Sequence, residues 1–192
     1  MTHLRILILS DPIEPPSYAP RVTSLFRFLK EAGYNVVLES GQKTEKQSRW
    51  AFFADKLWGR NDRQFGKMLQ RKYPQDRFDI ILCSTYYYFP LRTARYLSQL
   101  WQIPYVVDLR DIVEQWGTSF YFTTPLPHLG GLERIIARWY ERKNIRLRNQ
   151  IMQSAKAVIT VSPWHQQYLQ SLLRIWVLGN LKEPENVFVL GY

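Results

Sequence analysis

Short apolar runs alternate with amphipathic helical stretches along this 192-residue chain, and that alternation constrains its fold more than any other feature. Each run is short and mostly apolar, as expected of a strand that is buried on both faces of a sheet. These runs occupy residues 4–9, 34–38, 79–84, 105–108, 157–161 and 186–190. Helical periodicity predicts helices over residues 21–32, 91–102, 132–154 and 163–173.

Strands separated by helices indicate βαβ units, a parallel sheet and right-handed crossovers. We therefore predict an α/β fold in which residues 1–192 form one Rossmann-like three-layer domain. Its mostly parallel sheet should have six or more strands in the order 3-2-1-4-5-6, with helices on both faces. Residues 41–74 show helical patches without clear boundaries. The uncharged segment 117–131 is expected to be a flexible lid or a lipid-touching loop.

Several function classes are disfavoured by what the chain lacks. No Gly-x-Gly-x-x-Gly follows the first apolar run and no Walker loop is present, which disfavours a dehydrogenase or a P-loop NTPase. Cys83 is the only cysteine and the three histidines show no ligand spacing, so we expect no disulfide, metal or cofactor. With no long apolar window and no signal-peptide core, the expected location is cytoplasmic.

The charge balance is strongly basic: 26 Lys and Arg against 16 Asp and Glu give a net charge of +10. Nucleic acid, an anionic membrane face and an anionic substrate are the three physical interpretations. Bulky aromatics interleave with the two basic clusters, which favours peripheral binding to anionic lipid over an ordinary solvated helix face. The residues predicted at this membrane surface are Arg49, Trp50, Lys56, Trp58, Arg138, Trp139 and Arg142.

Hydroxyls, charges and aromatic rings follow the expected strands, where ligands bind in an open α/β sheet. Such a set suits a sugar that carries a phosphate, because rings stack on sugar faces and guanidinium binds phosphate. The candidate binding residues are Tyr18, Arg21, Ser84, Thr85, Tyr86, Arg110, Asp111 and Ser162. The alternative for each is structural; Arg21, a cation at a helix start, could instead pair with Asp11 or Glu14.

Four stretches in order carry a resemblance to a known family: residues 6–37, 78–84, 103–111 and 155–162, followed by a last strand at 186–192. The chain resembles the N-terminal half of GT-B fold glycosyltransferases of family 4. Two departures stand out. Tyr18, Ala19 and Pro20 replace a common glycine pair, and Arg110-Asp111 replaces a common His-Asp pair.

The resemblance implies the acceptor-binding half of a retaining glycosyltransferase. The full enzyme would move a sugar from a nucleotide-sugar to an acceptor, for example a lipid-linked or cell-envelope glycan in polysaccharide biosynthesis. The donor would bind in a C-terminal domain that this sequence does not contain, so the chain alone should be inactive. The alternatives are a basic nucleic-acid-binding module, although no nucleic-acid motif is visible, and a non-catalytic interaction domain.

Overall fold

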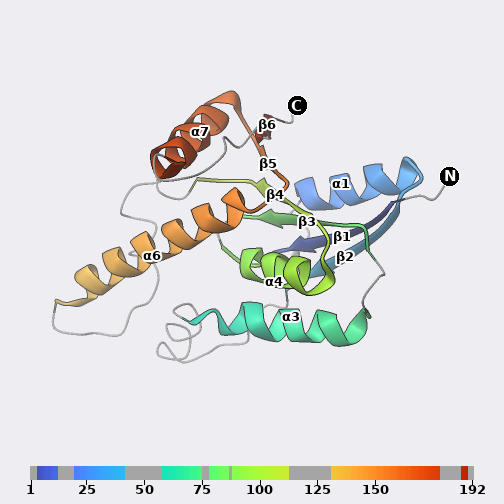
Figure 1. The fold of residues 1–192 in the computed structure, drawn as a ribbon, viewed down its shortest axis with the longest axis horizontal. Helices are drawn as coiled ribbons and strands as arrows, with labels where there is room; N and C mark the ends of the chain where they lie inside the picture. Colours follow the sequence, from blue (N-terminus) through green and yellow to red (C-terminus); the bar gives the residue numbers. More distant parts are fainter. Residues whose placement is uncertain are drawn as a thin grey trace.

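A computed structural model describes residues 4–12, 20–41, 58–74, 78–86, 88–112, 131–177 and 187–189. Within them lies one six-stranded sheet in which every pairing is parallel (Figure 1). Its strands are β1 (Arg5–Ser10), β2 (Asn35–Ser40), β3 (Ile80–Thr85), β4 (Tyr105–Leu109), β5 (Ala157–Thr160) and β6 (Val187–Val189). The helices are α1 (Pro20–Glu31), α3 (Arg60–Lys72), α4 (Leu91–Trp101), α6 (Glu133–Gln153) and α7 (Pro163–Val177). The expected α/β class is confirmed.

The strand order is β2-β1-β3-β4-β5-β6, so the expected order 3-2-1-4-5-6 is wrong. Strand β3 pairs with β1 and β4, whereas the expected order placed it outside β2. The burial pattern gives the reason: β3 is buried along nearly its whole length and suits a central position, while the half-exposed β2 suits an edge. The order reverses between β1 and β3, which is where doubly wound sheets open a ligand crevice.

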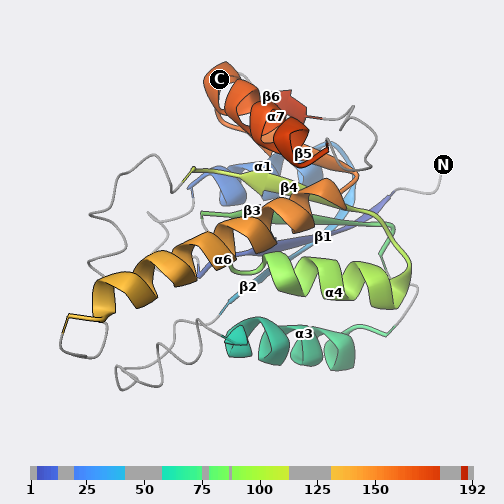
Figure 2. The same cartoon turned by 60° about the vertical axis from the view of Figure 1, so that its left-hand side comes forward.

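The two faces of the sheet are covered unequally. Helix α1 packs Val22 over a small apolar cluster that includes Ile8 and Leu82. The opposite face carries the larger core, to which α3, α4, α6 and α7 all contribute buried side chains. Figures 1 and 2 show α1 on one side of the sheet with α3 and α4 on the other. This arrangement follows from topology, since only the β1–β2 crossover runs in the opposite direction.

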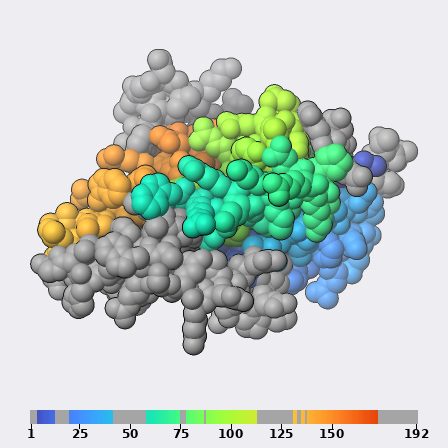
Figure 3. All heavy atoms as spheres, turned by 90° about the horizontal axis from the view of Figure 1, so that it is seen from below, coloured from blue at the N-terminus to red at the C-terminus, as the bar shows by residue number. Residues whose placement is uncertain are grey.

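Helix α3 lies in the stretch where the sequence gave no clear boundary. Its buried apolar side chains are Phe65 and Leu69, and a glycine stands between them in sequence. A Cβ added at Gly66 would lie 3.0 Å from Cδ1 of Tyr96 on α4, so the glycine permits a close approach of the two helices. Figure 3, which views the molecule from below, shows α3 and α4 against each other on this face.

Removing the Leu97 side chain tests the larger core. Leu97 on α4 is fully buried, so Leu97→Ala should lower the free energy of unfolding by about 2–5 kcal/mol through lost burial and a cavity. Leu100→Ala is the matched control on the same helix; Leu100 is 37% exposed, and its loss should cost about 0.5 kcal/mol or less. Urea denaturation measures both, and equal losses would contradict the assigned packing.

Candidate functional site

A row of polar side chains crosses the carboxyl end of the sheet. Ser10 on β1 is paired with Ser84 on β3, and Ser84 is paired with Asp108 on β4. Paired residues of parallel strands point to the same face. Here that face is the one under α1, because Ile8 and Leu82, two residues earlier on their strands, pack in the α1 cluster. The place between β1 and β3 where the strand order reverses, here called the switch point, therefore has polar side chains at the carboxyl ends of its strands.

Asp108 is the centre of a buried charge network. Its carboxylate is fully buried and accepts hydrogen bonds from Arg21 on α1, with Nη2 2.9 Å from Oδ1 and Nε 3.2 Å from Oδ2. The Ser84 hydroxyl donates to the same Oδ2 at 2.7 Å. The two-pronged pairing explains why a cation occupies the first turn of α1 despite the helix dipole. The sequence had suggested Asp11 or Glu14 as the partner of Arg21; Asp108 is a partner that it did not suggest, and Glu14 lies outside the described residues.

A second cluster lies at the mouth of the switch point and joins three strand ends. Asp11, one residue beyond β1, accepts a hydrogen bond at 2.8 Å from the backbone N–H of Tyr86. The same carboxylate oxygen forms an ion pair with Nη2 of Arg110, which follows β4. The Arg110 guanidinium lies 4.6 Å from the centroid of the Tyr86 ring. The cluster thus places a cation and an aromatic face in contact, with Tyr86 38% exposed.

One hydrogen-bond donor of Arg110 has no partner among the described residues. Its Nε is buried and has no hydrogen-bond partner within the part of the chain that the structure describes. The buried hydroxyl of Ser10, on the neighbouring strand β1, is in the same state. Buried polar groups without partners are destabilising, by about 1–3 kcal/mol each. Their position at a switch point indicates a place where a polar ligand would be favoured.

The other candidate residues form local hydrogen bonds. The Thr85 hydroxyl donates to the Phe89 carbonyl at 2.6 Å, and Oδ1 of the half-buried Asp111 accepts from the Ile112 N–H at 2.8 Å. The Ser162 hydroxyl accepts from the His165 N–H at 3.1 Å and caps α7. The candidates Tyr18, Arg49, Trp50 and Lys56, and residues 117–130 of the expected lid, lie outside the described residues.

Neither a cysteine nucleophile nor a metal cluster emerges from the described ranges. Cys83 is fully buried on β3, and burial raises the pKa of its thiol well above the usual value, so it is held as the unreactive thiol. Within those ranges, no group of three or more His, Cys, Asp or Glu side chains is placed to hold a metal ion. What the edge offers a ligand is therefore hydrogen bonding, charge and aromatic contact.

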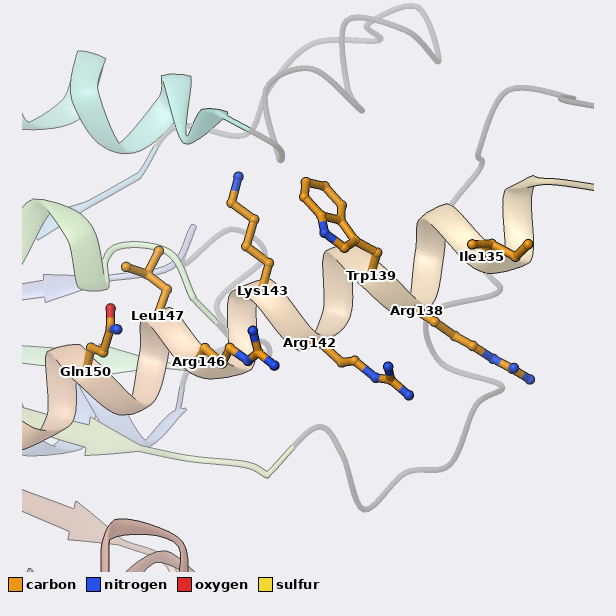
Figure 4. Close-up of a pocket in the computed structure, with 8 residues that line it drawn as sticks. All are labelled: Ile135, Arg138, Trp139, Arg142, Lys143, Arg146, Leu147 and Gln150. Carbon is orange, nitrogen blue, oxygen red and sulfur yellow. The ribbon is translucent and has the colours of Figure 1, made fainter. Parts of the chain in front are cut away.

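A second candidate surface runs along α6, where a groove of about 720 Å³ opens (Figure 4). Its lining residues are Ile135, Arg138, Trp139, Arg142, Lys143, Arg146, Leu147 and Gln150. Figure 4 shows Arg138, Arg142 and Arg146 pointing to one side of the helix, with Trp139, Lys143 and Leu147 on the other. The Lys143 ammonium lies 5.2 Å from the Trp139 ring centroid. One side of the helix therefore carries a row of arginines, and the other carries apolar side chains together with one lysine.

Helix α6 extends past the carboxyl edge of the sheet. Asn144 in its middle accepts a hydrogen bond at 3.4 Å from Arg92, which is in the first turn of α4 just after the carboxyl end of β3. The residues from Glu133 to Lys143 therefore extend roughly 16 Å beyond that level, at 1.5 Å per residue. Figure 1 shows this projection. We call the segment 133–143 the α6 overhang; it is at the same end of the domain as Asp11 and Arg110.

The structure shows which basic and aromatic residues of the two sequence clusters are exposed and which are buried. Arg138, Arg142 and Trp139 are exposed on α6, and Trp58 is 60% exposed just before α3. Lys143 and Arg146 join the groove although they were not among the predicted membrane residues; their i+4 spacing from Trp139 and Arg142 was the available signal. Arg148, by contrast, is only 1% exposed and contacts Asn149. Among the helices that the structure describes, none is both long and apolar enough to cross a membrane.

The geometry defines a class: a Rossmann-like α/β domain with charged and aromatic side chains at the point where its strand order reverses. Comparison with known families is more specific, because residues 16–176 match the glycosyl transferase 4-like domain. The chain belongs to this family, which confirms the resemblance seen in the sequence. Comparison with curated proteins found no significant match.

Solved structures give a related result. The glycotransferase of kitacinnamycin matches with a TM-score of 0.49 at 15% sequence identity. The match covers 86% of this chain and 48% of that one, so this chain spans about half the length of that protein.

Two ion pairs that differ in burial test the role of Asp108. Arg21→Met leaves a fully buried carboxylate unpaired and should lower the free energy of unfolding by about 3–5 kcal/mol. Lys72→Met removes the cation of the Lys72–Glu39 pair, which lies 2.7 Å apart with the lysine side chain 54% exposed, and should cost about 1 kcal/mol or less. Thermal and urea unfolding measure both. A negligible loss for Arg21→Met would show that Arg21 is free for another role.

Proposed function

We propose that this chain is the acceptor-binding half of a glycosyltransferase, with the nucleotide-sugar held by a second domain. The observation that carries the proposal is the cluster of Asp11, Arg110 and Tyr86 at the switch point, where one buried N–H of Arg110 has no hydrogen-bond partner among the described residues. Membership of the glycosyl transferase 4-like family supports sugar transfer as the reaction class.

The side chains at the carboxyl end of the sheet suggest which part of the reaction each of the two domains would support. In sugar transfer the oxygen of an acceptor hydroxyl bonds to the anomeric carbon, the bond from that carbon to the nucleoside diphosphate breaks, and the hydroxyl proton passes to an oxygen of the departing phosphate. Retaining transfer of this kind depends on stabilising the leaving phosphate, which we assign to the second domain. This half would orient the acceptor, since correct placement of two reactants lowers the barrier substantially. Tyr86, Arg110 and Asp111 would contact the acceptor, while Asp108, Arg21 and Ser84 hold the edge in shape.

We further propose that the α6 overhang lies on an anionic membrane at its cytoplasmic face. Its arginine stripe and its exposed Trp139 combine charge attraction with interfacial anchoring. We call the carboxyl end of the sheet, where Asp11, Tyr86 and Arg110 meet, the acceptor edge. Because the overhang is at this end of the domain, an acceptor anchored in that membrane could reach the acceptor edge. A lipid-linked or cell-envelope glycan is the acceptor class that fits both surfaces, and polysaccharide biosynthesis is the corresponding process.

Transfer assays test the missing-domain proposal. The 192-residue chain alone should transfer no sugar from radiolabelled nucleotide-sugars to membrane extracts, because the donor pocket would be absent. Supplying the second domain should restore transfer. Transfer by the chain alone would contradict the proposal.

Substitution of Arg110 tests the acceptor edge in that complete enzyme. Arg110→Ala should raise the acceptor KM by about tenfold or more, as expected for loss of a charge-assisted hydrogen bond, and leave the donor KM unchanged. Arg63→Ala, at an exposed position on α3, is the control and should change neither constant. Unfolding curves for the variants check that the effect is not a loss of folding.

Vesicle sedimentation tests the membrane proposal with a matched pair of double variants. Arg138→Gln/Trp139→Ser should weaken binding to anionic vesicles by about tenfold, since each basic residue near such a surface contributes about 1 kcal/mol. Arg27→Gln/Phe28→Ser removes an equivalent exposed pair from α1, across the sheet, and should leave binding unchanged. Binding should also fall in high salt. Equal binding to neutral vesicles would contradict the proposal, and tight sequence-specific DNA binding would favour a nucleic-acid-binding module.

A further inference from the structure

Trp164 is a large aromatic side chain exposed at the same sheet edge, outside the surfaces considered so far. It is the second residue of α7 and is 56% exposed. Thr160, the last residue of β5, is paired with Leu109 of β4, so the start of α7 follows the strand end next to Arg110 and Asp111. Neighbouring strands lie about 4.8 Å apart. Trp164 therefore belongs to the rim of the acceptor edge.

The Trp164 ring is held in place by its surroundings. It stacks on Tyr168, one turn later, with ring centroids 6.1 Å apart and an interplanar angle of 14°. The ring of His165, the next residue in the sequence, has its centroid 5.4 Å from that of Trp164. The start of the helix is fixed by the Ser162 cap, and the Thr160 hydroxyl donates to the Ser162 carbonyl at 3.2 Å. An exposed ring that is already ordered binds a ligand with little further loss of conformational entropy.

Trp164 and the α6 overhang differ in the charge of the residues around them. From Pro163 to Leu173, α7 has no Asp, Glu, Lys or Arg, whereas the overhang has several arginines. The polar residues close to Trp164 in sequence are instead His165, Gln166 and Gln167, and Gln167 is exposed. Amide and imidazole groups beside an aromatic face suit a neutral ligand rich in hydroxyls. They do not suit an anionic membrane, which needs cations.

We propose that Trp164 is a stacking platform for a pyranose ring of the acceptor, with Gln167 bonding to its hydroxyls. This inference rests on the proposed acceptor role of the edge and names the ligand class at one position of it. The apolar C–H face of the sugar lies on the indole ring, in the way aromatic faces take up flat apolar groups. The acceptor is then recognised through a carbohydrate unit at the β5 side of the edge, as well as through any lipid or phosphate near α6.

Saturation-transfer NMR on the 192-residue chain tests the platform with a panel of methyl pyranosides of glucose, galactose, mannose, N-acetylglucosamine and rhamnose. At least one should receive saturation, strongest at the C–H protons of one ring face. Trp164→Ala should weaken that binding by about tenfold and Trp164→Phe by less, because Phe keeps an aromatic face. Trp58→Ala removes a comparably exposed tryptophan before α3 and should leave binding unchanged. Gln167→Ala should weaken binding without changing which ring face is saturated.

The outcomes separate this inference from the proposed function. If no pyranoside of the panel binds the unaltered chain, the platform is wrong. The platform is also wrong if Trp164→Ala binds the pyranoside as tightly as the unaltered chain and Arg110→Ala binds it more weakly. That result would still support the acceptor edge. If neither substitution changes the binding, the sugar binds elsewhere, and both the platform and the acceptor edge are overturned. Unfolding curves for each variant show whether it keeps the fold.

Discussion

A carboxylate that is fully buried must be paired, and Asp108 is the point where this constraint shapes the molecule. Its two partners come from elements far apart in sequence: Arg21 from α1 and Ser84 from β3. Together they tie the first turn of α1 to the centre of the sheet at its carboxyl end. The position of α1 over the switch point therefore depends on this network, and so does the shape of the edge on which Asp11 and Arg110 meet.

The strands and most helices could be predicted from the sequence because their signal is local. Residues 80–83 form a continuous apolar run, and α4 repeats its buried apolar residues Leu91, Ala94, Leu97 and Trp101 at helical spacing. Helix α3 had no such signal: its buried face holds few apolar side chains, and Gly66 lowers its helical propensity. The glycine is explained only by the contact with α4, which is a tertiary fact.

Strand order and ion pairing could not be predicted from local sequence patterns, because they also depend on tertiary contacts. Whether β3 lies beside β1 or outside β2 depends on which neighbours bury it, and periodicity does not contain that information. The partner of Arg21 is 87 positions away, so the sequence could mark the arginine as unusual without finding Asp108. Sequence reasoning did place the candidate residues after the strands, and those that the structure describes lie near the carboxyl end of the sheet, because that assignment does not depend on the strand order. It treated Asp11 only as a possible partner of Arg21, whereas the structure pairs Asp11 with Arg110.

A basic surface on α6 and an uncharged surface on the first turns of α7 flank the carboxyl end of the sheet. On α6, Arg138, Arg142 and Arg146 recur every four residues, a spacing at which like charges repel and weaken a helix slightly. Such a stripe is best stabilised by an anionic partner that lies along it. On α7 the first turns carry no charge, and the exposed ring of Trp164 is ordered by Tyr168. Between them, the charge of Arg110 is balanced by Asp11, so the centre attracts a ligand by directional bonds more than by net charge. The acceptor that we propose, with a neutral sugar and an anionic end held at a membrane, would match this arrangement of charge.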